Sequence, residues 1–184
     1  MRQRTHLEPR DWAFCSVFGA AALLLPLIFH VLQLGKIFLP MYLPLFALAF
    51  VVRPYPCALT AALVPLLSAV LTGMPPLYPP VAWIMSVELA LSTSAVAWAA
   101  GRFPNRSPVL YLLPVLVLGR AFNAALNYFV ATWMSLPGSF LAGASFLSGW
   151  PGIVLLLLTI PAFTRLFSAY RPPPARETKG VALR

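Results

Sequence analysis

The sequence predicts an all-α membrane protein, a six-transmembrane-helix bundle with both termini in the cytoplasm. Of the 184 residues, 60% are hydrophobic and only 9% are charged, whereas a soluble domain of this size needs more polar residues to cover its surface. Uncharged apolar runs of near-spanning length recur along the chain. Almost all positive charges lie in the breaks between these runs, which is typical of membrane topology.

Six apolar runs are predicted as membrane crossings. In chain order they cover residues 12–34, 43–52, 58–72, 81–101, 108–134 and 150–168. Run 43–52 is short, so it completes a crossing only if its helix begins inside the preceding loop or is short and tilted. Pro65 and Pro161 are expected to kink the helices that contain them.

The chain is predicted to form one bundle with two flanking segments. Residues 1–11 are polar and form the predicted cytoplasmic N-terminus, and residues 12–168 form the bundle. The first run lacks a small-residue cleavage site, so we expect a retained helix and not a cleaved signal. Residues 169–184 are basic and proline-rich, which predicts a disordered cytoplasmic tail.

The distribution of Lys and Arg sets the predicted orientation. Six crossings put both termini on one side, and that side carries three basic residues before residue 12, one at Arg53, two at 102–106 and five from Arg165 onward. The opposite loops carry Lys36 alone, so the positive-inside rule predicts cytoplasmic termini. Those loops cover residues 34–42, 72–80 and 135–149. The net charge of +9 therefore follows the topology and does not indicate nucleic-acid binding.

Two charged residues lie inside apolar runs. Arg120 is in run 108–134, with no other charge between Arg106 and Arg165, and Glu88 is the one acid inside an apolar run. A guanidinium at bilayer depth is costly, so it faces a bundle interior or a wet cavity and has a partner. The predicted depths of Glu88 and Arg120 differ by about one helical turn, so their side chains are within reach of each other.

Asn123 and Asn127 extend the polar face of Arg120. They follow it at three and seven residues and therefore share its side of a helix. The functional interpretation is a small-ligand pocket in the outer half of the membrane, with Glu88 and Arg120 as charged anchors and the two asparagines as amide contacts. The alternative is a structural ion pair that only holds two helices together.

Three further residues are candidates for the same pocket. His30 lies near the outer end of the first run and either lines the pocket or is an interfacial histidine. Tyr128 and Trp133 are candidates to stack on a flat ligand. The other aromatic residues near the outer boundary are predicted to form an interfacial belt, and these are Tyr42, Tyr78, Trp83 and Trp150.

Small residues four apart in the first run allow another helix to approach closely. These pairs are Cys15 with Gly19 and Ser16 with Ala20, and ordinary packing within the bundle is an equally good interpretation. Cys15 and Cys57 are read as buried packing residues without a disulfide or a metal. No catalytic motif or phosphate loop is present, so no enzyme activity and no cofactor is expected.

The chain resembles the substrate-binding S component of energy-coupling factor (ECF) transporters, the vitamin-uptake systems of prokaryotes. The similar segments are LPLIFH with LGKIFLPMYLPLFAL (within 24–48), PLLSAVLTGMPPLYPP (65–80), IMSVELAL (84–91), LGR (118–120) and SGWPGIVLLLLTIPAF (148–163). They occur in the family's order and cover most of the chain. The segment around Met41 carries Tyr42 where the family often has a histidine.

The resemblance implies a six-helix bundle in a prokaryotic plasma membrane, with an outer pocket closed by the external loops. It implies capture of a vitamin or similar micronutrient, and docking on a transmembrane coupling subunit that is joined to two ATPases. The family docks through an Ala-xxx-Ala stripe on its first helix, for which Cys15, Ser16, Gly19 and Ala20 are the equivalents here.

Two other functions fit the sequence. One is a small autonomous permease, although the two halves show no inverted repeat and the chain has no relay of acids. The other is a membrane structural or assembly protein in which Glu88 and Arg120 only fix the packing.

Overall fold

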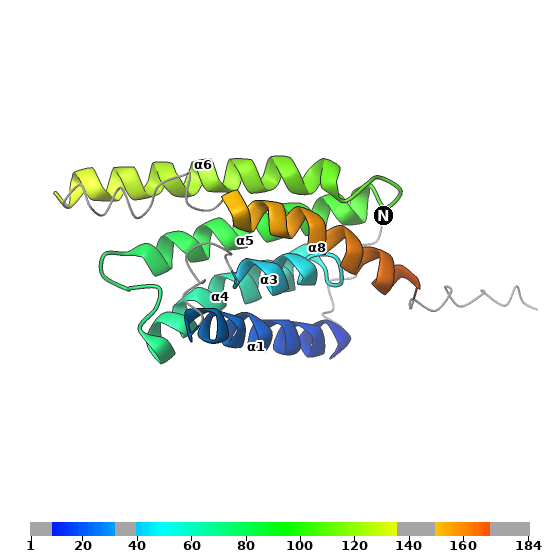
Figure 1. Ribbon diagram of the computed structural model, residues 1–184, viewed down its shortest axis with the longest axis horizontal. Coiled ribbons are helices and arrows are strands. Elements are labelled where there is room, and N and C mark those ends of the chain that lie inside the picture. The colour runs from blue at the N-terminus through cyan, green and yellow to red at the C-terminus, as the bar shows by residue number, and fades with distance from the viewer. Residues whose placement is uncertain (1–8, 32–39, 136–149, 170–184) are drawn as a thin grey trace, which may run out of the picture.

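The computed structural model describes residues 9–31, 40–135 and 150–169, and in these ranges the chain forms helices and turns without a strand (Figure 1). The helices are α1 (Pro9–Val31), α3 (Tyr42–Leu48), α4 (Pro54–Thr72), α5 (Val81–Arg102), α6 (Val109–Trp133) and α8 (Trp150–Ala169). Helices α1, α4, α5 and α6 are long and apolar enough to cross a membrane, and α8 contains a shorter apolar stretch, Trp150–Leu166. The prediction of a helical membrane protein is confirmed at this level.

The predicted loops at 34–42 and 135–149 and the tail at 169–184 fall mainly outside the described residues. Lys36 and most of the N-terminal segment 1–11 also lie outside them. The connection 72–80 is described. It contains cis peptide bonds before Pro75 and Pro79, and Gly73 adopts a left-handed conformation (φ 72°) that ends α4.

Helix α3 differs from the sequence prediction of a crossing over 43–52. It has seven residues, which gives a length of only about 10 Å, so it is too short to span a bilayer. All of its residues except Leu43 are buried, and it packs against α1, α4, α5 and α8. An apolar run without a polar face is buried on every side, so α3 forms the centre of the bundle.

Helix α4 begins earlier than the predicted residue 58. Pro54 occupies the first turn, where its missing N–H is not needed, and Arg53 precedes it in an extended conformation. The prolines at 54 and 56 therefore start the helix and do not extend the turn before it.

Helices α1 and α4 run in the same direction, side by side. The start of α1 contacts the start of α4, where the Cys15 Sγ donates to the Pro56 carbonyl at 3.7 Å. The other end of α1, around Leu27, shares a groove with Thr72 at the end of α4. Because Asp11 pairs with Arg53, Arg53 lies at the end of the bundle where α1 begins, opposite the end where α1 stops.

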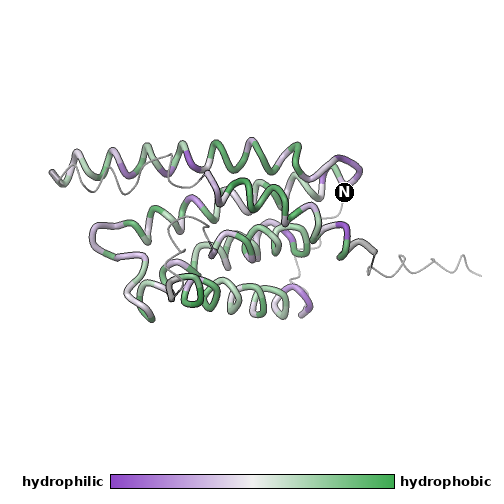
Figure 2. The backbone as a smooth tube through the Cα atoms, viewed as in Figure 1, coloured by the Kyte–Doolittle hydropathy of each residue, from purple (hydrophilic) through white to green (hydrophobic). Residues whose placement is uncertain are grey.

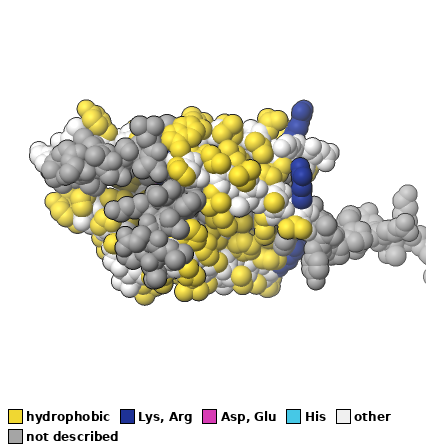
Figure 3. Space-filling model, viewed as in Figure 1, with side chains coloured by type: hydrophobic (Ala, Val, Ile, Leu, Met, Phe, Trp, Pro, Cys, Tyr) yellow, Lys and Arg dark blue, Asp and Glu magenta, His cyan; other side chains and the backbone are white. Residues whose placement is uncertain are grey.

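Most described arginines gather at one end of the molecule. Figure 3 shows Lys or Arg side chains at the right-hand end of the face in view, with many apolar side chains on the described surface beside them. The arginines outside the bundle interior are at the start of α1, before α4, in and after the end of α5, and near the end of α8: Arg10, Arg53, Arg102, Arg106 and Arg165. Large apolar side chains are exposed along the helices, for example Val70 (72%) and Leu118 (68%). The exterior is therefore that of a protein in lipid.

Candidate functional site

The site is built at a close contact between α5 and α6. A Cβ atom added at Gly119 would lie 2.7 Å from the Ser92 Oγ and 3.5 Å from the Glu88 Oε1. Only a glycine leaves room for this contact, because real Cβ atoms do not come within 3.0 Å of such a neighbour. Gly119 therefore allows α6 to lie directly against the face of α5 that carries Glu88.

Glu88 is the centre of the site. Its side chain is buried, with 2% of the residue exposed. The Oε2 atom accepts hydrogen bonds from the Tyr42 hydroxyl at 2.6 Å and from the Asn123 Nδ2 at 2.7 Å. A carboxylate buried in an apolar bundle requires such donors, since an unpaired charge there is strongly unfavourable.

Arg120 reaches the same group from α6. Its Nη1 lies 3.5 Å from the Tyr42 hydroxyl oxygen, and its Cζ lies 6.0 Å from the centre of the Tyr42 ring. Glu88 and Arg120 do not form the direct ion pair that their depths suggested. The Tyr42 hydroxyl lies between them, accepting from the guanidinium and donating to the carboxylate.

Asn127 adds a second amide to the site. Its Nδ2 donates to the side-chain Oδ1 and to the main-chain oxygen of Asn123, both at 2.9 Å. This orientation of the amide is fixed because both partners are acceptors, and the reversed amide would place oxygen against oxygen. Asn123 and Asn127 are 8% and 3% exposed.

The five side chains form one continuous hydrogen-bonded chain, here named the polar cluster. It runs from Arg120 through Tyr42 to Glu88, and from Asn127 through Asn123 to the same carboxylate. Both ends of the chain are open. The Nε of Arg120 and the Oδ1 of Asn127 are buried and have no hydrogen-bond partner among the described residues. Figure 2 shows hydrophilic residues part-way along α6, within an otherwise hydrophobic helix.

Tyr42 is the member of the cluster that the sequence analysis misassigned. It was predicted to belong to an interfacial aromatic belt, but only 2% of it is exposed and its hydroxyl joins Arg120 to Glu88. The available signal was its position in a fully apolar short run, because a buried tyrosine hydroxyl needs a hydrogen-bond partner. Tyr78 and Trp83 are exposed, as expected of a belt.

Two predicted site residues are not part of the cluster, and the side chain of a third, His30, is not described. Tyr128 and Trp133 are 62% and 80% exposed on the outside of α6, so they do not stack over the buried polar face. Their spacing from Asn127 rotates them away from it, at about 100° per residue for Tyr128. His30 lies in the last turn of α1, and its side chain is outside the described part of the structure.

The small residues of α1 divide between two faces. Cys15 and Gly19 are buried, and a Cβ at Gly19 would lie 3.4 Å from the Thr60 side chain of α4. This pair serves packing within the bundle. Ser16 and Ala20 are exposed, and the Ser16 hydroxyl is bonded to the main chain of its own helix. Of the two predicted docking pairs, Ser16 and Ala20 form the accessible one.

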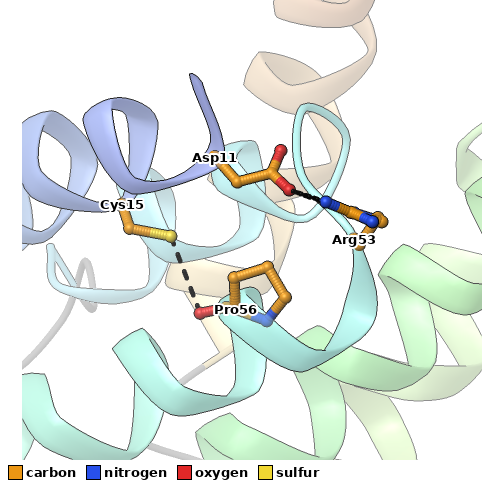
Figure 4. Close-up of polar contacts among 4 residues, drawn as sticks. All are labelled: Asp11, Cys15, Arg53 and Pro56. Atoms are coloured by element: carbon orange, nitrogen blue, oxygen red, sulfur yellow. Dashed lines mark hydrogen bonds and ion pairs between the residues drawn. The ribbon is translucent and has the colours of Figure 1, made fainter. Parts of the chain in front are cut away.

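An ion pair at the arginine-rich end was not anticipated from sequence. The Asp11 Oδ2 accepts from the Nη2 and Nε of Arg53 at 2.7 and 3.0 Å (Figure 4). Beside it, Cys15 of α1 contacts Pro56 of α4. The pair fixes the first turn of α1 to the segment that enters α4.

The groove formed by described residues is separate from the polar cluster. It has a volume of about 620 Å³ and lies between α1 and the end of α4. Its lining is almost entirely apolar and consists of Ala20, Leu23, Leu24, Leu27, Leu71 and Thr72. Within the described ranges, no three His, Cys, Asp or Glu side chains come together as a metal site.

The fold and the site together define a helical membrane protein whose interior holds a hydrogen-bonded polar cluster. Comparison with known proteins gave no match to a family model, a curated protein or a solved structure.

Proposed function

We propose that this protein is the substrate-capture subunit of an ATP-driven importer of the ECF type, which binds a vitamin or similar small micronutrient. The observation that supports this most strongly is the pair of open ends in the polar cluster. Buried polar atoms are normally hydrogen-bonded, and the Arg120 Nε and Asn127 Oδ1 are not. A ligand that supplied the missing partners would explain why an arginine and two asparagines are kept inside an apolar bundle.

The proposed topology has six crossings with both termini in the cytoplasm. Two observations support it. The arginine-rich end of the bundle fits the cytoplasmic side under the positive-inside rule. Val31 and Arg53 lie at opposite ends of the bundle although α3 itself is short, so the proposal includes one further crossing between them.

This orientation assigns the polar cluster to the outer half of the membrane. Glu88 lies seven residues from the start of α5, or about 10 Å, and fourteen residues from Arg102, or about 21 Å. Asn127 lies about 9 Å from the end of α6 at Trp133. A substrate arriving from outside would therefore reach the asparagine end of the cluster first.

The proposed partners are a transmembrane coupling subunit and its two ATPases. The exposed Ser16 and Ala20 on α1 are the proposed docking face, since small residues allow a second helix to approach. Cys15 and Gly19 pack against α4, so they are not part of the proposed docking face.

A second candidate is a structural role, which one observation favours. The Oε2 of Glu88 receives both of its hydrogen bonds from protein side chains, so α3, α5 and α6 are joined without any ligand. In that case the cluster fixes the packing and its open ends carry no cargo.

Native mass spectrometry of the gently purified protein separates these functions. We expect a co-purified small molecule in the wild type and its loss in Arg120→Gln, with Arg106→Gln, at an exposed turn, as the matched control. A wild type without bound cargo, also after incubation with a vitamin panel, would support the structural role. Uptake into liposomes that contain this protein alone would instead indicate an autonomous permease.

A further inference from the structure

The open ends of the polar cluster specify complementary chemistry in a ligand. The Arg120 Nε is an unpartnered donor on a cation, and the Asn127 Oδ1 is an unpartnered acceptor on a side chain that is 97% buried, since only 3% of it is exposed. A donor on a guanidinium is best satisfied by an anionic oxygen. An amide oxygen is satisfied by an N–H or O–H group.

The charges already present restrict the ligand further. The cluster contains one buried carboxylate, Glu88, and one guanidinium, Arg120, which balance each other through Tyr42. A ligand with a net charge would leave one charge uncompensated inside an apolar bundle, which is strongly unfavourable. A ligand that brings an anionic group to Arg120 must therefore also bring a positive charge.

The separation of the two ends sets the shape of the ligand. Arg120 and Asn127 are seven residues apart on one face of α6, which is about 10 Å along the helix. We therefore expect the two ligand groups to lie on separate parts of the molecule and not on one carbon atom, as they do in an α-amino acid. The anionic and cationic groups must lie at opposite ends of the molecule.

On these grounds, and resting on the proposed function, we infer that the substrate is an elongated zwitterion. Its carboxylate binds the Arg120 guanidinium, and its protonated primary or secondary amine at the other end donates to the Asn127 Oδ1. Glu88 is not displaced by the ligand, because its Oε2 keeps its contacts with Tyr42 and Asn123.

The test uses a polar metabolite extract of bacterial cells as the probe, in three forms. One part is untreated, one is amidated so that carboxylates become neutral, and one is acetylated so that amines become neutral. Wild-type protein in detergent is incubated with each, separated from free compounds and examined by native mass spectrometry. We expect a bound zwitterion from the untreated extract, and at least about a tenfold lower occupancy from each treated extract.

Variants test the two contacts separately. Arg120→Gln should no longer bind the compound that is lost from the amidated extract. Asn127→Leu should lower the occupancy of the same compound by about tenfold or more. Arg106→Gln should bind it as the wild type does. Helix content and size-exclusion profiles are compared in each case. Where a variant fails to fold, the comparison of extracts on wild-type protein still decides the question.

The outcomes distinguish the two proposals. If the wild-type protein binds no compound from the untreated extract, the capture function is overturned, and the zwitterion inference with it. Retention of a compound that lacks either charge, or equal retention from the amidated or acetylated extract, overturns the zwitterion inference and leaves the capture function supported.

Discussion

The hydroxyl group of Tyr42 donates a 2.6 Å hydrogen bond to the carboxylate of Glu88, and this contact connects the buried helix α3 to α5. The same hydroxyl oxygen is the nearest hydrogen-bonding partner that the described residues offer to the guanidinium of Arg120, at 3.5 Å. A single phenol therefore mediates between the two opposite charges of the bundle interior.

Tyr42→Phe tests whether the Tyr42 hydroxyl stabilises the bundle through its contacts with Glu88 and Arg120. The variant leaves the Glu88 Oε2 with one donor instead of two and removes the oxygen beside Arg120. We expect a loss of stability of about 1–3 kcal/mol, measured by thermal unfolding in detergent. Tyr55→Phe is the matched control, because Tyr55 is 67% exposed at the start of α4. Equal stability of the two variants would contradict the role given to the Tyr42 hydroxyl.

Gly119→Ala tests the close approach of α5 and α6. The added Cβ would lie 2.7 Å from the Ser92 Oγ, so either this side chain or the helices must shift, and we expect a loss of about 1–3 kcal/mol and weaker ligand binding. Ser92→Ala removes the clashing oxygen and should restore part of the loss in the double variant. Gly101→Ala, also in a helix but with nothing within 4 Å of its Cβ, should be neutral or stabilising.

The ion pair between Asp11 and Arg53 should contribute little under ordinary salt. The Arg53 side chain is 38% exposed, so solvent screens the pair, and Asp11→Asn is expected to lower stability by about 1 kcal/mol or less. The difference from wild type should shrink as salt is raised. Melting temperatures measured over a salt series provide the check. A loss that is large and independent of salt would show that Asp11 acts through something other than this pair.

The two faces of α1 should respond oppositely to a larger side chain. Gly19→Leu pushes against Thr60 and is expected to destabilise the bundle by about 1–3 kcal/mol. Ala20 is exposed in the groove beside α4, so Ala20→Leu should change stability little while weakening association with the proposed coupling subunit. Thermal unfolding and co-purification with the partner measure the two effects. Intact association of Ala20→Leu would remove this face from consideration as the docking surface.

The composition and the charge pattern were sufficient to predict a helical membrane protein, because the bilayer permits few backbone structures and requires long apolar helices. The helices of runs 58–72, 81–101 and 108–134 match α4, α5 and α6 within a few residues at each end. The face shared by Arg120, Asn123 and Asn127 could be read from helical periodicity alone. The position of α3 could not be predicted in this way, because a short run that is apolar on every side does not indicate which helices will pack around it.

The class of the protein, the helices that carry the polar residues and the side of α6 on which they lie could all be predicted from the order of the residues. These are local properties, set by hydropathy and by a fixed rotation per residue. Three features became apparent from the packing of the helices: Tyr42 separates Glu88 from Arg120, Gly119 allows α5 and α6 to touch, and Cys15 and Gly19 face inward. Such contacts join residues far apart in the chain, and they depend on how whole helices pack.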